Sequence, residues 1–146
     1  MAVEQFIERY LSTPNELPDE SEQVAKPAVI NQGDIYWLRF DAGHSPQSDI
    51  PHPYVVIQEN VLNHSRLATV VVCALTSNLK RASYPGNVLL EADEANLPRQ
   101  SVVEISKVAA VAKIRLADYI GSLNEQRVQQ ILAGMRFQQV SFFNRD

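Results

Sequence analysis

The sequence contains one cysteine, five glycines and no long apolar run. With Cys73 alone, no intrachain disulfide can form, and its apolar neighbours predict a small buried residue in a protein from a reducing compartment. No run approaches the roughly 18 apolar residues of a membrane-spanning helix, and the start, MAVEQFIERYL, lacks the apolar core of a signal peptide. We therefore expect a soluble, cytoplasmic protein with no membrane partner.

Positive charge is also scarce. The 146 residues carry 13 Lys and Arg against 17 Asp and Glu, a net charge of -4, whereas broad nonspecific binding to nucleic acid needs many phosphate contacts from lysine and arginine. This balance excludes a generally basic nucleic-acid-binding protein and leaves room for a local basic groove. A hydrophobic fraction of 45% is typical of one globular domain of this length.

Several signatures of catalysis are missing. The three histidines, His44, His52 and His64, stand in no HxH or HExxH pattern and no CxxC accompanies them, so no metal site is expected. The scattered glycines form no Walker loop, no dinucleotide fingerprint and no GxSxG elbow. Acyl transfer, nucleotide hydrolysis and a bound cofactor are therefore not expected.

Residues 1–30 are predicted to form an N-terminal amphipathic helix followed by a polar arm. The helix has apolar residues at helical spacing: Val3, Phe6, Ile7, Tyr10 and Leu11. Because so short a helix is marginal alone, its apolar stripe is expected to dock on the body of the protein or on another chain. The acidic, proline-containing segment that follows is predicted to be a linker or a wrapped arm, and residues 31–146 form the remaining domain.

From residue 31 onward the pattern is mainly β. Alternating or β-branched stretches bounded by turn formers predict strands at residues 34–40, 53–58, 67–75, 87–92, 101–105, 107–113 and 120–123. Their spacing predicts a compact barrel. The residues YPGN, Tyr84 to Asn87, fit a type II turn, and residues 59–65 fit one irregular helical turn.

The C-terminal segment is predicted to be a helix. Asn124 is its expected N-cap, and Leu123 and Val128 stand at the spacing of a hydrophobic staple. An apolar stripe expected to pack on the core consists of Val128, Ile131, Leu132, Met135 and Phe142.

His52 is held between two prolines immediately before an apolar run. Pro51 fixes its own φ, and Pro53 biases the preceding residue toward an extended backbone. A proline is acceptable at the first position of a strand. His52 is therefore predicted at a junction between a loop and a strand, within reach of solvent, a place that suits either catalysis or an ordinary turn.

Several motifs, taken in order, resemble one family. They are GDIYW at residues 33–37, PYVVIQENVLNHSRLATVVV at 53–72, ALTSNLKRASYPGNVLL at 74–90, LPRQSVVEISKV at 97–108 and RLADYIGSLNEQ at 115–126. Together they resemble the MazF/PemK toxin ribonucleases of bacterial toxin-antitoxin systems. The resemblance implies a mainly β fold, a small SH3-like barrel with a C-terminal helix, to which this chain adds the N-terminal amphipathic helix.

The chain also departs from the family pattern. The family has G-x-R-P before the apolar strand, with its arginine implicated in RNA cleavage, and this chain has His52 at that position. The threonine implicated as partner corresponds to Thr76. The family loop G-S-E-Q is here Ser45 to Ser48, and three polar positions of the family's R-T-x-D are Ala109, Ala110 and Ala112.

The resemblance implies roles for particular residues. His52 is the expected general acid or base, and Thr76 the phosphate-binding hydroxyl. The expected RNA contacts are Ser77, Lys80, Arg81, His44 and Gln47. More ordinary interpretations stay open: a turn histidine for His52, a hydroxyl that caps a turn for Thr76, a solvated pair for Lys80 and Arg81, and a solvated loop residue for His44. His64 is assigned to structure.

The implied function is a toxin-like endoribonuclease that cleaves single-stranded RNA without metal or cofactor, by attack of the 2'-hydroxyl. The family also implies a homodimer with an RNA groove across the subunit interface, and a cognate antitoxin whose acidic tail enters that groove. One alternative is a catalytically degenerate member of the family that binds RNA or protein. Another is internal inhibition by the acidic residues 16–22, ELPDESE.

Overall fold

The structure, a computed structural model, describes residues 29–39 and 52–143, with no side chains described for residues 140–143. Several predicted features lie outside the described residues: the N-terminal helix, the acidic arm up to residue 28, Pro51, His44, Gln47 and the side chain of Phe142.

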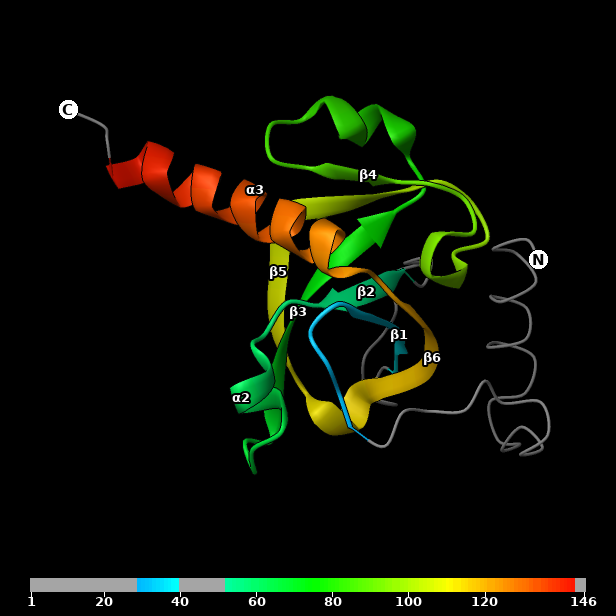
Figure 1. Cartoon of the computed structure of the whole chain (residues 1–146), viewed down its shortest axis with the longest axis vertical. Coiled ribbons are helices and arrows are strands. Elements are labelled where there is room, and N and C mark those ends of the chain that lie inside the picture. Colours follow the sequence, from blue (N-terminus) through cyan, green and yellow to red (C-terminus); the bar gives the residue numbers. More distant parts are fainter. Residues whose placement is uncertain (1–28, 40–51, 144–146) are drawn as a thin grey trace.

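Six antiparallel strands form one sheet in the order β4-β5-β3-β2-β1-β6 (Figure 1). The strands are β1 Asp34–Leu38, β2 Pro53–Val56, β3 Thr69–Thr76, β4 Val88–Leu90, β5 Ser101–Ala112 and β6 Leu116–Ser122. The mainly β prediction is confirmed. Within the described ranges β4 and β6 are the end strands, so the predicted barrel is observed here as a sheet with two ends.

Helical segments connect and cover the sheet. They are α2 Asn60–Asn63, α3 Glu125–Phe143 and three short 3-10 helices, η1 Leu79–Ser83, η2 Glu94–Asn96 and η3 Lys113–Arg115. The irregular helical turn and the C-terminal helix were both predicted. In Figure 1, α3 runs beside β4 and β5 and its C-terminal end projects beyond the sheet. Neither α3 nor any other helix of the described part is long and apolar enough to cross a membrane.

Two boundaries predicted from the sequence are wrong. The stretches 101–105 and 107–113 were predicted as separate strands, but they form a single strand, β5. The pairing of β5 with β3 continues across an irregularity between Cys73 and Leu75, where the sequence predicted a break. Strand β6 begins at Leu116 rather than at residue 120, since Leu116 and Ala117 are buried against neighbouring elements. Both features depend on contacts with other strands.

Apolar residues cover both faces of the sheet. One cluster includes Ile35, Trp37, Val55, Cys73, Leu75, Val103 and Ile105 from the strands, with Val128 and Ile131 from α3. The other cluster consists of Tyr36, Leu38, Val56, Val70, Val72 and Leu116. The predicted stripe of α3 therefore does pack on the core, where Leu132 and Met135 also contact the first cluster.

The Gly33–Asp34 pair at the start of β1 has a structural explanation. Gly33 has a φ of +96°, and a Cβ there would lie 2.9 Å from Cγ2 of Val128. Asp34 is 3% exposed, and its carboxylate accepts hydrogen bonds from the Ser122 hydroxyl at 2.6 Å and the Asn31 N–H at 2.9 Å. Together these residues join β1 to β6 and to the start of α3.

Two local predictions are confirmed in detail. In the YPGN turn, Gly86 has a φ of +88° and the Asn87 N–H donates to the Tyr84 carbonyl at 3.1 Å, as a type II turn requires. At the start of α3, the Arg127 N–H donates to the Asn124 side chain at 2.9 Å. Asn124 is therefore the N-cap.

Candidate functional site

The start of β2 and the end of β3 lie at the same edge of the sheet. The two strands pair antiparallel with Tyr54 opposite Ala74, and β2 begins at Pro53 while β3 ends at Thr76. Continuing that register by two residues pairs position 52 with position 76. Residues directly opposite in an antiparallel pair share a face of the sheet, so the register favours His52 and Thr76 as neighbours on one face.

His52 immediately precedes β2 and is exposed. His52 therefore lies directly before a strand, as predicted, and its ring is outside the core.

Thr76 is partly buried, and its hydroxyl already has one local partner. The Asn78 N–H donates to Oγ1 of Thr76 at 3.2 Å, and the Asn78 side chain in turn accepts from the Lys80 N–H at 3.2 Å. These bonds shape the turn into η1, which is the capping role weighed from the sequence. A hydroxyl that accepts one hydrogen bond still has a proton to donate, so the turn contact and a phosphate contact are compatible.

The Arg81 side chain contacts other side chains of the protein, whereas the ordinary interpretation made Lys80 and Arg81 a solvated pair. Its Nη1 donates to the Tyr84 hydroxyl at 3.0 Å, and its Cζ lies 5.1 Å from the centroid of the Tyr84 ring. Its Nε is 3.9 Å from Oε1 of Glu104. Ser77 and Lys80 are exposed beside it, so three predicted RNA contacts lie on the one segment that follows Thr76.

Glu104 was not identified as a candidate residue from the sequence. Its side chain is 6% exposed, and its Oε2 lies 2.9 Å from Nζ of Lys107. Glu104 follows Val102 by two residues, and Val102 pairs with Thr76, so Glu104 and Thr76 lie on the same face. The available signal was a lone carboxylate inside the apolar run SVVEI, where an unpaired charge would be costly to bury.

The remaining candidates divide into two groups. His44 and Gln47 lie outside the described residues. His64 is described, and a ring nitrogen lies 2.9 Å from Oδ1 of Asn31, which ties α2 to the segment before β1 and supports its structural assignment. Ala109 and Ala110 are exposed on β5.

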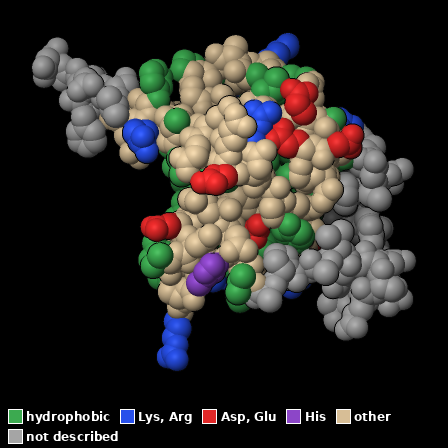
Figure 2. Space-filling view, in the orientation of Figure 1, with side chains coloured by type: hydrophobic (Ala, Val, Ile, Leu, Met, Phe, Trp, Pro, Cys, Tyr) green, Lys and Arg blue, Asp and Glu red, His purple; other side chains and the backbone are tan. Residues whose placement is uncertain are grey.

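Charge is mixed rather than concentrated on the visible surface. Among the described residues drawn in Figure 2, acidic and basic side chains are interspersed. Within the same ranges, no three His, Cys, Asp or Glu side chains gather as metal ligands would.

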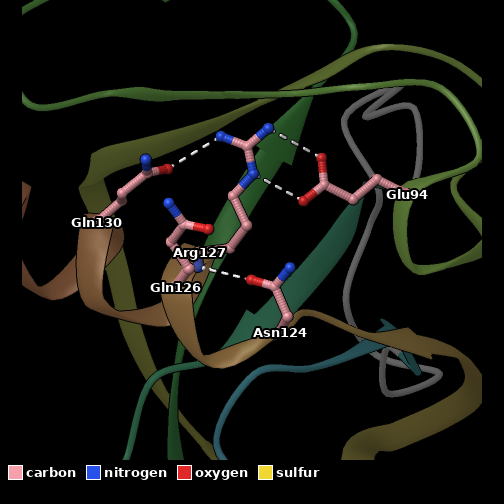
Figure 3. Close-up of a pocket in the computed structure, with 5 residues that line it drawn as sticks. All are labelled: Glu94, Asn124, Gln126, Arg127 and Gln130. Carbon is pink, nitrogen blue, oxygen red and sulfur yellow. Dashed lines mark hydrogen bonds and ion pairs between the residues drawn. The ribbon is translucent and has the colours of Figure 1, made fainter.

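A hollow of about 420 Å³ lies at η2 and the start of α3, away from the segments that carry the predicted site residues (Figure 3). Arg127 lines it and forms two contacts with the Glu94 carboxylate, at 2.7 and 3.1 Å, and one with Gln130 at 2.9 Å. The charges of Arg127 and Glu94, which both line the hollow, are therefore paired with each other. The hollow is better explained as a structural junction between η2 and α3.

Comparison with known proteins identifies relatives of the chain. Residues 31–138 match the model of the PemK-like, MazF-like toxin of type II toxin-antitoxin system. The endoribonuclease MazF2 of Mycobacterium bovis is 36% identical over 108 residues, which cover 74% of this chain and 95% of the relative. The endoribonuclease EndoA of Bacillus subtilis is 24% identical over 103 residues, covering 70% and 88%.

The fold has solved counterparts. The structure of an endoribonuclease in complex with its cognate antitoxin, from Mycobacterial species, superposes with a TM-score of 0.60 at 21% identity and covers 75% of this chain and 94% of the other. This similarity establishes a shared fold. Because the family model spans most of the chain and the 36% identical relative is covered almost completely, this chain belongs to the PemK-like, MazF-like toxins of type II toxin-antitoxin systems.

Proposed function

We propose that this chain is an endoribonuclease that cleaves single-stranded RNA without a metal ion, by attack of a 2'-hydroxyl on the adjacent phosphate. The observation that carries the proposal is the β2–β3 register, which favours His52 and Thr76 as neighbours at one edge of the sheet. Relatives named as endoribonucleases, at 36% and 24% identity, support it.

Each step of this reaction has a candidate group. The 2'-hydroxyl loses its proton as its oxygen bonds to phosphorus, and the departing 5'-oxygen gains a proton, so a cyclic phosphate and a free 5'-hydroxyl result. His52 serves as the acid or base, because an imidazole exchanges a proton near neutral pH. The Thr76 hydroxyl donates to a phosphate oxygen.

Histidine does not replace every property of the family's arginine. A guanidinium is a permanent cation with a planar set of donors, and histidine is not. Lys80 and Arg81, on the segment after Thr76, supply the lasting positive charge in this proposal. Ser77, together with His44 and Gln47, completes the RNA contacts in this proposal.

The partners follow from the family. A solved relative is an endoribonuclease in complex with its cognate antitoxin. By analogy, this chain acts as a homodimer and is held inactive by an antitoxin of its own, which competes with RNA for the same edge.

A second candidate function is a catalytically degenerate member of the family that binds RNA or protein. The observation that favours it is the loss of polar groups: Ala109 and Ala110 are exposed on β5, and His52 stands where the family has arginine. Such a protein keeps the fold and the partner surface while losing cleavage.

Cleavage of a long RNA in EDTA tests the two functions. The purified protein is compared with His52→Ala, His52→Arg and Thr76→Ala, and His64→Ala serves as the control because His64 is an exposed histidine on a different segment. The endoribonuclease requires cleavage by the wild type, a loss of about 100-fold or more in His52→Ala, and little change in His64→Ala. An inactive wild type together with an active His52→Arg variant identifies the degenerate member.

A further inference from the structure

We propose that Glu104 is a positioning residue for RNA cleavage: from an irregular part of β5, its buried carboxylate holds the Arg81 guanidinium beside the end of β3. The inference deepens the proposed function and rests on it. Its basis is the cluster of Glu104, Arg81, Lys107 and Tyr84. In this cluster the Arg81 guanidinium contacts the buried Glu104 carboxylate, the Tyr84 hydroxyl and the Tyr84 ring.

The register of β5 explains why Glu104 faces this way. Cys73 pairs with Val108, whereas Leu75, two residues further, pairs with Val103. Five residues of β5 therefore separate partners that lie two residues apart on β3. Such irregularities re-aim side chains and are common beside active sites. The extra length holds Glu104 and Lys107, the two residues that form the 2.9 Å ion pair.

Glu104 is placed to act on Arg81 rather than on RNA directly. Its side chain is 6% exposed, whereas that of Arg81 is 41% exposed. A substrate in solvent therefore reaches Arg81 first. A buried carboxylate is tolerated when cations compensate it, and here Lys107 and Arg81 together leave a local excess of positive charge that favours a phosphate.

Arg81 has contacts on two sides. Its Nε faces Glu104, and its Nη1 donates to the Tyr84 hydroxyl while the guanidinium lies over the Tyr84 ring. A guanidinium has five N–H donors, so Nη2 keeps donors that neither contact uses. The segment carrying Arg81 packs against β5 and β4 and begins three residues after Thr76.

This arrangement compensates for the arginine that His52 replaces. A cation stabilises a phosphorane best when it is fixed before charge develops. Arg81 on a flexible side chain alone would attract RNA without being fixed; Glu104 and Tyr84 supply the fixation. The effect of Glu104 is therefore expected mainly on the chemical step and only weakly on affinity.

The test compares Glu104→Gln, Arg81→Lys and the double variant with the wild type. Single-turnover cleavage gives the rate, and fluorescence anisotropy with a 2'-O-methyl oligonucleotide gives affinity without cleavage. The side-chain Nε–Hε signal of Arg81 in ¹⁵N NMR reports its order. The control is Glu94→Gln, which weakens a second carboxylate–arginine pair, that of the partly buried Glu94 and Arg127 (Figure 3).

The expected result is a cleavage rate about tenfold lower in Glu104→Gln, an affinity within about threefold of the wild type, and an Arg81 signal that is broadened or shifted. In the Arg81→Lys background the same change lowers the rate by less than about twofold, because residues that act as a unit are not additive. Glu94→Gln is expected to lower the melting temperature and leave the cleavage rate unchanged.

Three results overturn the inference alone. The first is an active wild type whose rate and Arg81 signal are unchanged in Glu104→Gln, and the second is an equal loss of rate in both backgrounds. The third is a loss of rate that merely parallels a loss of melting temperature, as judged against Glu94→Gln. A wild type that neither binds nor cleaves RNA overturns the proposed function, and this inference with it.

Discussion

Gly86 and Gly134 lie backbone against backbone, so that neither position has room for a side chain. A Cβ on Gly86, whose φ is +88°, would lie 3.1 Å from the carbonyl oxygen of Gly134, and a Cβ on Gly134 would overlap the carbonyl oxygen of Gly86. The turn before β4 and the middle of α3 are thereby packed directly together.

Gly134→Ala is therefore expected to destabilise the protein, although alanine is the better helix former. Overlap with backbone cannot be relieved by a rotamer change, so we expect the free energy of unfolding to fall by about 2 to 3 kcal/mol. Urea unfolding measures it. Gln129→Ala, at an exposed position of the same helix, should change it by less than about 0.5 kcal/mol; equal effects would argue against the close approach.

Ala95→Gly is expected to stabilise the protein. Ala95 has a φ of +51°, in the left-handed region that glycine adopts without strain. Relief of that strain outweighs the extra chain entropy of glycine, for a gain of up to about 1 kcal/mol. Ala92→Gly, an exposed neighbour whose φ is not positive, should be neutral or destabilising, and thermal melts of the two variants give the comparison.

Asp34→Ala is expected to cost about 3 kcal/mol in the free energy of unfolding. The buried carboxylate accepts from Ser122 and Asn31, and its removal leaves both donors without their partner. Asp118→Ala removes an exposed carboxylate from β6, the strand that pairs with β1, and should have little effect. Similar losses in both variants would contradict a central role for Asp34.

Stability should fall at alkaline pH because of Cys73. Burial, reinforced by the nearby charge of Glu104, raises the pKa of the Cys73 thiol to about 12. In the unfolded chain the thiol ionises near its ordinary pKa of about 8.5. The native state therefore keeps a proton that the unfolded state releases, so the thiol's contribution to stability is complete below that pH and is lost as the pH rises toward 12.

Urea unfolding at two pH values measures this effect. Between about pH 8 and 10 the wild type should lose about 2 kcal/mol more than Cys73→Ala. The difference between the two proteins isolates the contribution of the thiol from every contribution that the two proteins share. A parallel decline of both proteins would show that Cys73 does not carry the dependence.

Local features could be predicted from the sequence, and long-range ones could not. The YPGN turn and the Asn124 cap depend on neighbouring residues only, and both are confirmed. The union of two predicted strands into β5 depends on how β5 pairs with β3, which no local pattern reveals.

The candidate site shows the same division. His52 and Thr76 could be nominated because the family resemblance assigned roles to their positions, and the proline–histidine–proline step agreed with it. Glu104 is 23 residues from Arg81 in sequence and meets it through the packing of η1 on β5. The lone carboxylate in the apolar run SVVEI was the available signal for Glu104, and it gave no means to identify the partner.

The Cys73 thiol donates a hydrogen bond to the carbonyl oxygen of Glu104, and Cys73 belongs to the cluster under α3. A substitution that removes the Cys73 thiol would remove this hydrogen bond from the backbone of Glu104. The carboxylate of Glu104 lies on the opposite face of the sheet from the thiol. Searches for variants with altered turnover should therefore include the interior position 73, because the Cys73 thiol contacts the backbone of the residue that carries this carboxylate.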